Sequence, residues 1–141
     1  MKILIAADGS PFTKRMLAYL AAHDEWLGGG RHEYTVLNSV MPVPARAASV
    51  IDRDTLKAYY ADTSEAVFKP IRVFFKKQGI EASFVSKVGH APEVIAKAAD
   101  SGDFDLLLMG SHGHGTLGNL VMGSVATKVL AACKTPVLLI R

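Results

Sequence analysis

The fold is decided by the stretch Gly110-Ser111-His112-Gly113-His114-Gly115-Thr116-Leu117-Gly118-Asn119-Leu120-Val121-Met122-Gly123-Ser124. It follows an apolar run, residues 106–109, that is typical of a buried strand, and it leads into a predicted helix at residues 124–132. Ligands of open α/β sheets bind beyond the carboxyl ends of strands. Glycine lets the backbone approach a phosphate closely, and a helix N-terminus offers N–H groups to an anion. This order of elements therefore predicts a phosphate-binding cradle.

Strand and helix patterns alternate along the rest of the chain. Short apolar runs bounded by turn residues predict strands at residues 2–7, 33–40, 80–88, 104–109 and 136–140. Apolar residues at spacings of three and four predict helices at residues 11–27, 56–78 and 92–99, besides 124–132. Such a series argues for a parallel sheet with helices on both faces. We expect one α/β domain over residues 1–141, because a single domain typically has roughly 100–200 residues.

Proline and glycine mark where the predicted helices begin, end or bend. Ser10 is expected to cap the first helix and Pro11 to be its first residue, and the glycines at 28–30 are expected to end it. Residues 41–50 are expected to form a loop. Pro70 stands inside the long second helix, where a proline costs roughly 3 kcal/mol. We therefore expect a kink there, or two shorter helices.

Composition excludes several classes of protein. Half of the residues are apolar and 21% are charged, a mixture that can bury a core and excludes disorder as the main state. No apolar run approaches the roughly 18 residues of a membrane span, and Asp8 comes too early for a signal peptide, so we expect a cytoplasmic protein without a membrane partner. The single cysteine, Cys133, excludes an intramolecular disulfide. The net charge of +3 comes from scattered bases, so we expect no nucleic-acid partner.

Three nucleotide-binding patterns compete for the glycine-rich stretch. A Walker A motif fails, because Ser124 stands where that motif needs the lysine that reaches the β- and γ-phosphates. The dinucleotide fingerprint GxGxxG is present from Gly113 to Gly118, but it follows the fourth predicted strand and no acidic residue lies downstream to hold a ribose. The third pattern fits: Gly110, Gly113, Gly123 and Ser124 form the motif G-x2-G-x9-G-[ST].

With this motif the chain resembles the ATP-binding branch of the universal stress protein family, over its whole length. The opening strand and acidic turn, Ile3-Leu4-Ile5-Ala6-Ala7-Asp8-Gly9-Ser10, is also similar to the family's pattern. The resemblance implies an open, Rossmann-like, adenine-nucleotide-binding sheet of five parallel strands in the order 3-2-1-4-5. In that order the last strand lies at an edge. Because Val137-Leu138-Leu139-Ile140 is apolar on both faces, we expect a homodimer that pairs through it.

The resemblance implies a role for each residue that matches the motif. The end of the first strand would line the adenine and ribose, the backbone of Val40 would meet the adenine, and the end of the fourth strand would lie beside the ribose. The glycine loop and the following helix start would hold the phosphates, which would in turn hold Mg²⁺. The implied ATP-binding set is Ala6, Ala7, Asp8, Val40, Met109, Gly110, Gly113, His114, Gly123, Ser124 and Val125.

Two positions depart from the family's pattern. Arginine commonly follows the second glycine, and this chain has His114 there, so a permanent cation becomes one that titrates near neutrality. We therefore expect ATP affinity to rise as pH falls. Glutamate often stands three residues after the serine, where this chain has Thr127. Ser124 is thus expected to cap the last helix without the reciprocal partner of a capping box.

The same residues also have purely structural interpretations. The glycines can be turn residues, Asp8 can cap the first helix, and His112 is expected to be a solvated loop residue. The sequence contains no GxSxG elbow and no carboxylate pair in the loop, so we expect a regulatory binding protein with little or no ATP hydrolysis. The alternatives are a slow ATPase and a dimeric interaction module that binds no nucleotide.

Overall fold

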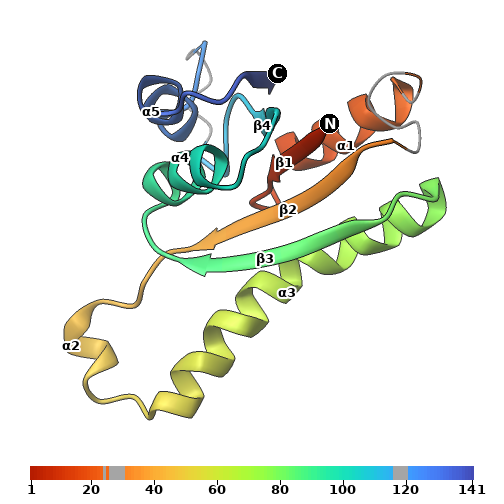
Figure 1. Cartoon of the computed structure of the whole chain (residues 1–141). Coiled ribbons are helices and arrows are strands. Elements are labelled where there is room, and N and C mark those ends of the chain that lie inside the picture. Colours follow the sequence, from red (N-terminus) through yellow and green to blue (C-terminus); the bar gives the residue numbers. More distant parts are fainter. Residues whose placement is uncertain (24, 26–30, 116–120) are drawn as a thin grey trace.

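The computed structural model describes residues 1–23, 25, 31–115 and 121–141. Five parallel strands form one sheet (Figure 1). They are β1 (Lys2–Ala6), β2 (Glu33–Val40), β3 (Ala82–Val88), β4 (Leu106–Gly110) and β5 (Val137–Ile140). Their order across the sheet is β3-β2-β1-β4-β5. The predicted single-domain α/β fold and its strand order are therefore confirmed.

The first strand of the sequence lies in the middle of the sheet. Ile5 of β1 pairs with Val36 of β2 on one side and with Leu108 of β4 on the other. All three side chains are fully buried. From β1 the strand order runs outward in two directions, which makes the carboxyl ends of β1 and β4 the switch point where open α/β sheets bind their ligands.

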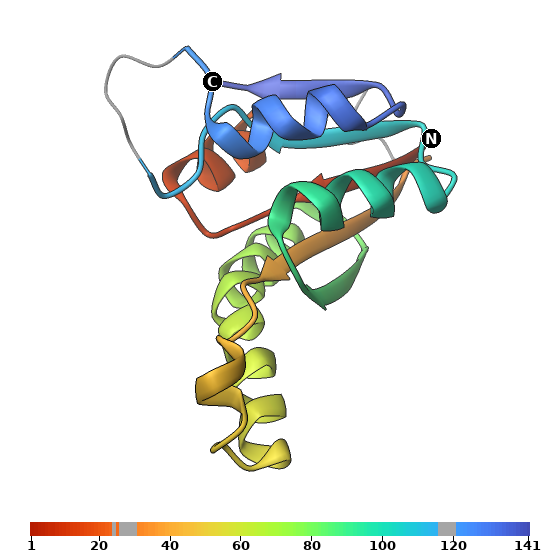
Figure 2. The ribbon, with the colours of Figure 1, turned by 90° about the vertical axis from the view of Figure 1, so that its left-hand side faces the viewer.

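Helices cover both faces of the sheet, as the strand–helix alternation predicts (Figure 2). On one face, α1 (Pro11–Ala22) and α3 (Arg53–Gln78) pack in a cluster that contains Ile3 and Ile5. On the other face, α4 (Ala91–Ser101) and α5 (Ser124–Ala132) pack in a cluster that contains Leu4 and Leu107. Successive side chains of a strand point to opposite faces, so β1 supplies residues to both clusters.

Pro70 does not divide the long helix, so the alternative of two shorter helices is wrong, and the alternative of a kink stays a prediction. α3 is a single helix of 26 residues, and Figure 1 shows one continuous coil. The proline removes the helical partner of the Ala66 carbonyl. Both Pro70 and Ala66 are exposed, so water can take the place of that hydrogen bond. The helix ends before Gly79, whose φ of 66° suits glycine.

Two other predicted boundaries differ from the structure. α1 ends at Ala22, and the glycines at 28–30 that were to end it lie outside the described residues. A short helix, α2 (Ala45–Ala48), lies within the stretch 41–50 for which the sequence predicts a loop. α2 and the first half of α3 extend beyond the carboxyl ends of β2 and β3 (Figures 1 and 2).

Candidate functional site

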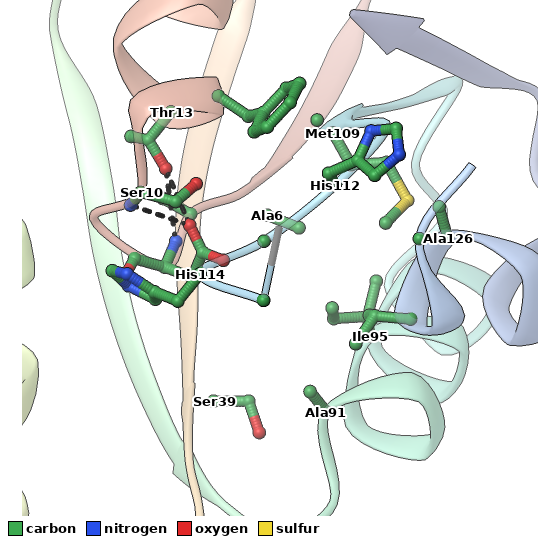
Figure 3. A pocket seen from close by; sticks show the side chains of 18 of the residues that line it. Ala6, Ser10, Thr13, Ser39, Ala91, Ile95, Met109, His112, His114 and Ala126 are labelled. Atoms are coloured by element: carbon green, nitrogen blue, oxygen red, sulfur yellow. Dashed lines mark hydrogen bonds between the residues drawn. The ribbon is translucent and has the colours of Figure 1, made fainter. Parts of the chain in front are cut away.

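A cavity of about 220 Å³ opens at the carboxyl ends of β1 and β4 (Figure 3). The β1–α1 turn, the β4–α5 loop and the starts of α4 and α5 contribute to its walls. Ten of the eleven residues that the family resemblance implies for ATP line this cavity: Ala6, Ala7, Asp8, Met109, Gly110, Gly113, His114, Gly123, Ser124 and Val125. The fold thus brings together residues from three separate parts of the sequence. Their part in binding stays a prediction.

Val40 is the member of the implied set that does not line the cavity. Its side chain is buried, with 4% of its surface exposed, and its carbonyl oxygen accepts a hydrogen bond from the Gly89 N–H at 2.9 Å. Its neighbour Ser39 lines the cavity instead. Because adjacent residues of a strand point to opposite sides, the sequence pattern alone does not settle which one faces the cavity. Backbone contact between Val40 and an adenine stays a prediction.

Asp8 holds the β1–α1 turn in shape. Its Oδ1 accepts hydrogen bonds from the Ser10 N–H at 2.9 Å and from the Thr13 hydroxyl at 3.1 Å. The Thr13 hydroxyl oxygen also accepts the N–H groups of Asp8 and Gly9, at 3.3 and 3.2 Å. Gly9 has a φ of 77°, a conformation that side chains rarely adopt. The turn is therefore fixed by its own groups before any ligand arrives.

The glycine loop after β4 contacts this turn at Asp8. The Nε2–H of His114 donates to the Asp8 carbonyl oxygen at 2.6 Å. A Cβ at Gly113 would lie 2.8 Å from Oδ2 of Asp8, so only glycine fits there without a shift. The two segments are 106 positions apart, and their contact closes one end of the cavity.

Two further glycines permit close packing around the cavity. A Cβ at Gly110 would lie 2.6 Å from the Cβ of Phe12, and a Cβ at Gly123 would lie 3.0 Å from the Ser111 carbonyl oxygen. The Gly123 N–H donates to that same oxygen at 2.7 Å. Gly115 differs, because a Cβ there would meet none of the described atoms within 4 Å. A side chain at Gly110 or Gly123 would therefore press on neighbouring atoms, whereas the described residues leave space for one at Gly115.

The start of α5 lies at the cavity without a side-chain cap. Gly123 occupies the N-cap position, and among the described residues no side chain makes a cap hydrogen bond to the helix. The prediction that Ser124 caps this helix is therefore wrong: Ser124 is the first helical residue, and its side chain is exposed. The Thr127 hydroxyl donates to the Gly123 carbonyl at 2.8 Å, which fixes the first turn from the other side.

His112 is not the solvated loop residue that we expected. It is partly buried, lines the cavity, and its ring lies 5.0 Å from that of Phe12. Its Nδ1 lies 2.9 Å from the Ser111 hydroxyl oxygen. The guanidinium of Arg15 covers the Phe12 ring at 4.8 Å. A histidine in a glycine-rich loop is expected to be exposed. His112 is partly buried because Phe12 of α1 packs against it, and that contact has no sequence signal.

The sequence reasoning also missed the side of the cavity that faces α4. Residues there come from the end of β2 and the start of α4, and most are small or apolar. Such residues look like ordinary core residues in the sequence, so no signal marks them. The cavity-lining residues outside the predicted set are Ser10, Phe12, Thr13, Leu37, Ser39, Ala91, Ile95, His112, Gly115 and Ala126.

A second aspartate holds a turn before the amino end of β5, at the end of the strands opposite to the cavity. The Asp100 carboxylate accepts hydrogen bonds from the Lys134 and Thr135 N–H groups, the Thr135 hydroxyl and the Cys133 thiol. The hydrogen bond from the Thr135 N–H is the main cause that lowers the pKa of Asp100 below its ordinary value. Burial and the nearby carboxylate raise the pKa of the Cys133 thiol, so this cysteine is a weak nucleophile.

The described residues contain no cluster of three or more histidines, cysteines or acids that could hold a metal ion. In the same part of the chain, none of the helices is long and apolar enough to cross a membrane. The chain's own chemistry at the cavity therefore consists of backbone N–H groups, hydroxyls, two imidazoles and the Asp8 carboxylate.

Two curated relatives are similar to almost the whole chain. A universal stress protein of Thermus aquaticus is 31% identical over 139 residues, which are 99% of this chain and 97% of the relative. The universal stress protein Slr1230 of Synechocystis is 30% identical over 140 residues. That match covers 99% of this chain but only 42% of the Synechocystis protein.

Solved structures share the fold. A universal stress protein family protein from Arabidopsis thaliana with AMP bound superposes with a TM-score of 0.69 at 16% identity, covering 99% of this chain and 90% of that one. A universal stress protein in complex with cAMP gives a TM-score of 0.66 at 19% identity, covering 100% and 96%. The model of the universal stress protein family matches residues 1–141, and this chain therefore belongs to the universal stress protein family.

Proposed function

We propose that this chain binds ATP in the cavity between β1 and β4 and acts as a cytoplasmic regulatory protein with little or no ATP hydrolysis. The start of α5 carries the proposal. Gly123, Ser124 and Val125 line the cavity, and no side chain in the described part of the chain caps the helix. Uncapped N–H groups and the positive end of the helix dipole attract phosphate.

The two ends of the cavity differ in the way that a nucleotide requires. Leu37, Ala91 and Ile95 form an apolar end together with the hydroxyl of Ser39. Figure 3 shows Ser39, Ala91 and Ile95 grouped on the side away from Ser10 and Thr13. Ligand pockets commonly combine an apolar surface with a few polar groups that fix orientation. The apolar end suits a base, and the glycine loop with the α5 start suits the phosphates.

Adenine is favoured as the base because related proteins of the same fold hold AMP and cAMP. The triphosphate is proposed from the G-x2-G-x9-G-[ST] motif, which brings Gly110, Gly113 and Gly123 to the cavity. Among the described lining residues Asp8 is the only carboxylate. Mg²⁺ commonly takes one or two carboxylates together with substrate phosphates, so the phosphates would supply most of its ligands here.

The state of the polar side chains supports binding over hydrolysis. Asp8 Oδ1 is already engaged by the Ser10 N–H and the Thr13 hydroxyl. The His114 ring is engaged by the Asp8 carbonyl, and the His112 ring lies against the Ser111 hydroxyl. A general base must reach the proton that it removes. The Asp8 Oδ1 and His112 contacts lie within their own segments, and the His114 contact joins the two segments, so these atoms already have structural partners.

The test compares two glycines of the same loop. In Gly123→Val the new side chain would press against the Ser111 carbonyl and the His112 Cα, at 3.0 and 3.1 Å from its Cβ, and would cover the α5 start. We expect ATP affinity to fall by about 100-fold or more, because two or more charge-assisted hydrogen bonds are lost. Gly115→Val is the matched control, since it also lines the cavity but has open space around its Cβ.

Calorimetry with nucleotide-free protein measures both variants, and circular dichroism checks that each is folded. A folded Gly123→Val protein with wild-type affinity would show that the phosphates bind elsewhere. Wild-type protein that neither retains adenine nucleotide on purification nor binds added ATP would favour the nucleotide-independent interaction module. Steady release of labelled phosphate from ATP, lost in Gly123→Val, would favour the slow ATPase.

We further propose that two copies pair through β5. This strand lies at the edge of the sheet. The Pro136 and Ile140 carbonyls accept hydrogen bonds from β4 and the loop after it, so the backbone groups of Val137 and Leu139 point away from β4. Leu138 and Leu139 pack toward opposite clusters. An apolar edge with free backbone groups favours antiparallel pairing with a second copy about a two-fold axis.

Replacing Leu139 with proline tests this pairing. Proline removes an N–H that points outward and leaves the hydrogen bonds to β4 intact, a position where sheets accept proline. We expect Leu139→Pro to be a folded monomer by light scattering. Leu139→Ala, which loses the same side chain but keeps the N–H, should stay dimeric. A wild-type protein that is monomeric at tens of micromolar, about 10-fold above a micromolar Kd, would refute the dimer.

A further inference from the structure

The hydroxyl of Ser10 is buried at the cavity wall without a hydrogen-bond partner among the described residues. Ser10 is 0% exposed, and its Oγ makes no hydrogen bond within that part of the chain. The residue stands at the N-cap position of α1, where a serine side chain normally accepts an N–H of the first turn. Here the side chain makes no such bond. The hydroxyl therefore has no part in the hydrogen bonding of the turn that contains it.

Other groups satisfy the turn without this hydroxyl. The Ser10 N–H donates to Asp8 Oδ1 at 2.9 Å, and the Ser10 carbonyl oxygen accepts the Thr13 N–H at 3.0 Å. The Thr13 hydroxyl takes the N–H groups of Asp8 and Gly9. An alanine at position 10 would keep every one of these bonds. The serine hydroxyl is thus an addition that the turn does not need.

A buried hydroxyl without a partner destabilises the folded protein, because it gave up its hydrogen bonds to water. A ligand atom inside the cavity would supply the hydrogen-bond partner that the buried Ser10 hydroxyl lacks. Ser10 is among the residues that line the cavity. Figure 3 places it beside Thr13 and near His114, on the side away from Ala91 and Ile95. It lies at the polar end, far from the apolar surface that suits a base.

We propose that the Ser10 hydroxyl donates a hydrogen bond to an oxygen of the ribose–phosphate half of the bound nucleotide. The inference rests on the proposed function and adds to it a residue outside the glycine motif. A phosphate oxygen and a ribose hydroxyl share the acceptor chemistry that the hydroxyl requires. The ligand series below distinguishes them.

The test measures Ser10→Ala twice, once without and once with nucleotide. Without nucleotide we expect the midpoint of urea unfolding to stay the same or rise, since an unsatisfied polar group has been removed. With ATP we expect affinity to fall about 10-fold, the usual size of one hydrogen bond to a polar or charged ligand atom. A capping serine would give the opposite pair of results, with lower stability and unchanged affinity.

Ser64→Ala is the matched control. Ser64 is also a buried serine, 2% exposed, but its hydroxyl donates to Asn38 Oδ1 at 3.0 Å and it does not line the cavity. We expect this variant to lose stability and to keep its ATP affinity. The two serines should therefore respond in opposite ways to the same substitution.

Calorimetry of wild type and Ser10→Ala with ATP, AMP, adenosine and adenine locates the acceptor. A weakened affinity for ATP and AMP alone assigns a phosphate oxygen, and a weakened affinity that extends to adenosine assigns the ribose. Both results support the proposal. Equal weakening for adenine, or a Ser10→Ala protein that is less stable without nucleotide, would overturn it.

Failure of the inference and failure of the proposed function give different results. If wild type binds ATP and Ser10→Ala binds it equally well, only the inference is wrong. If wild type binds none of the four compounds, the proposed function is wrong and the inference is wrong with it.

Discussion

Asp8 and Asp100 hold turns at opposite ends of the strands with the same kinds of hydrogen bond. Asp8 lies beyond the carboxyl end of β1 and lines the cavity, whereas Asp100 holds the turn before the amino end of β5 and is not among the residues that line it. Each Oδ1 accepts a backbone N–H and a threonine hydroxyl within 3.1 Å. At Asp100 the second oxygen also accepts a bond, from the Lys134 N–H at 3.2 Å. At Asp8 the second oxygen has no hydrogen bond within the described residues and faces Gly113. We infer that Asp100 is purely structural, whereas Asp8 holds its turn with one oxygen and keeps the other for a ligand.

Exchange of each aspartate for alanine gives the largest expected difference. Asp8→Ala should lower ATP affinity about 10- to 100-fold, because hydrogen bonds to charged groups contribute about 1.5–3 kcal/mol. Asp100→Ala should leave ATP affinity within about 2-fold, since distant sites act independently. Calorimetry on both folded variants measures the contrast. Equal losses in the two would mean that Asp8, too, acts only through the fold.

The pH dependence of stability tests the structural role of Asp100. Its pKa is lowered in the folded protein, first of all by the Thr135 N–H, so its contribution is present at pH 7 and is lost as pH falls through the folded-state value. Asp100→Ala should therefore unfold at lower urea than wild type at pH 7. The two unfolding midpoints should converge as the pH falls through the lowered folded-state pKa of Asp100. A gap that keeps the same size throughout an acid titration would contradict the role of the charged carboxylate.

The smallest expected effect on ATP affinity comes from His114, which contacts the carbonyl oxygen of Asp8. It tests whether the surroundings of Asp8, unlike those of Asp100, contribute to binding. Histidine changes charge between about pH 5 and 8, and a nearby phosphate favours the charged form. Protonation leaves both ring nitrogens as donors, so the bond to the Asp8 carbonyl persists. Wild-type ATP affinity should rise about 3- to 10-fold from pH 8 to 6, about the size of one ordinary hydrogen bond.

Titration of His114→Ala and His114→Arg across the same pH range supplies the comparison. Both variants should lose the pH dependence, with the arginine variant keeping the higher affinity at pH 8. A pH profile shared by wild type and His114→Ala would place the titrating group elsewhere.

The strands and the glycines of the cavity could be predicted because local patterns determine them. The apolar run before Gly110 is bounded by turn residues and is typical of a buried strand, and the residues that follow such a strand lie at its carboxyl end. Gly110, Gly113 and Gly123 line the cavity for that reason. Predicted and observed strands differ by one or two residues at their ends, which is the ordinary spread of such boundaries.

The hydrogen bonds at the helix starts could not be predicted. Ser10 and Ser124 each precede an apolar periodic run, and propensity favours both as caps. In the structure Asp8 and Thr13 accept the N–H groups of the turn before α1, the Ser10 side chain makes no cap hydrogen bond, and Gly123 takes the N-cap position of α5. A shift of one residue at a helix start depends on what the preceding loop contacts.

The α4 side of the cavity needed the tertiary structure for a different reason. Ala91 and Ile95 have the spacing of any buried helical face. Their place at the cavity depends on how α4 crosses the sheet beside the end of β2, which no short-range pattern records. Pro70 is similar, because its effect on α3 depends on the exposure of Ala66.

The central position of β1 has a consequence for the nascent chain. Within the sheet, β1 is synthesised before the other strands and β2 follows soon after, but the other neighbour of β1, β4, appears about 100 residues later. At roughly 5–20 residues per second, several seconds pass before β4 can pair with the residues around Ile3 and Ile5. A ribosome-associated chaperone would find an apolar target in β1 during this interval, and synthesis that stalls before residue 106 would leave an unpaired, aggregation-prone edge on a strand that is central in the finished sheet.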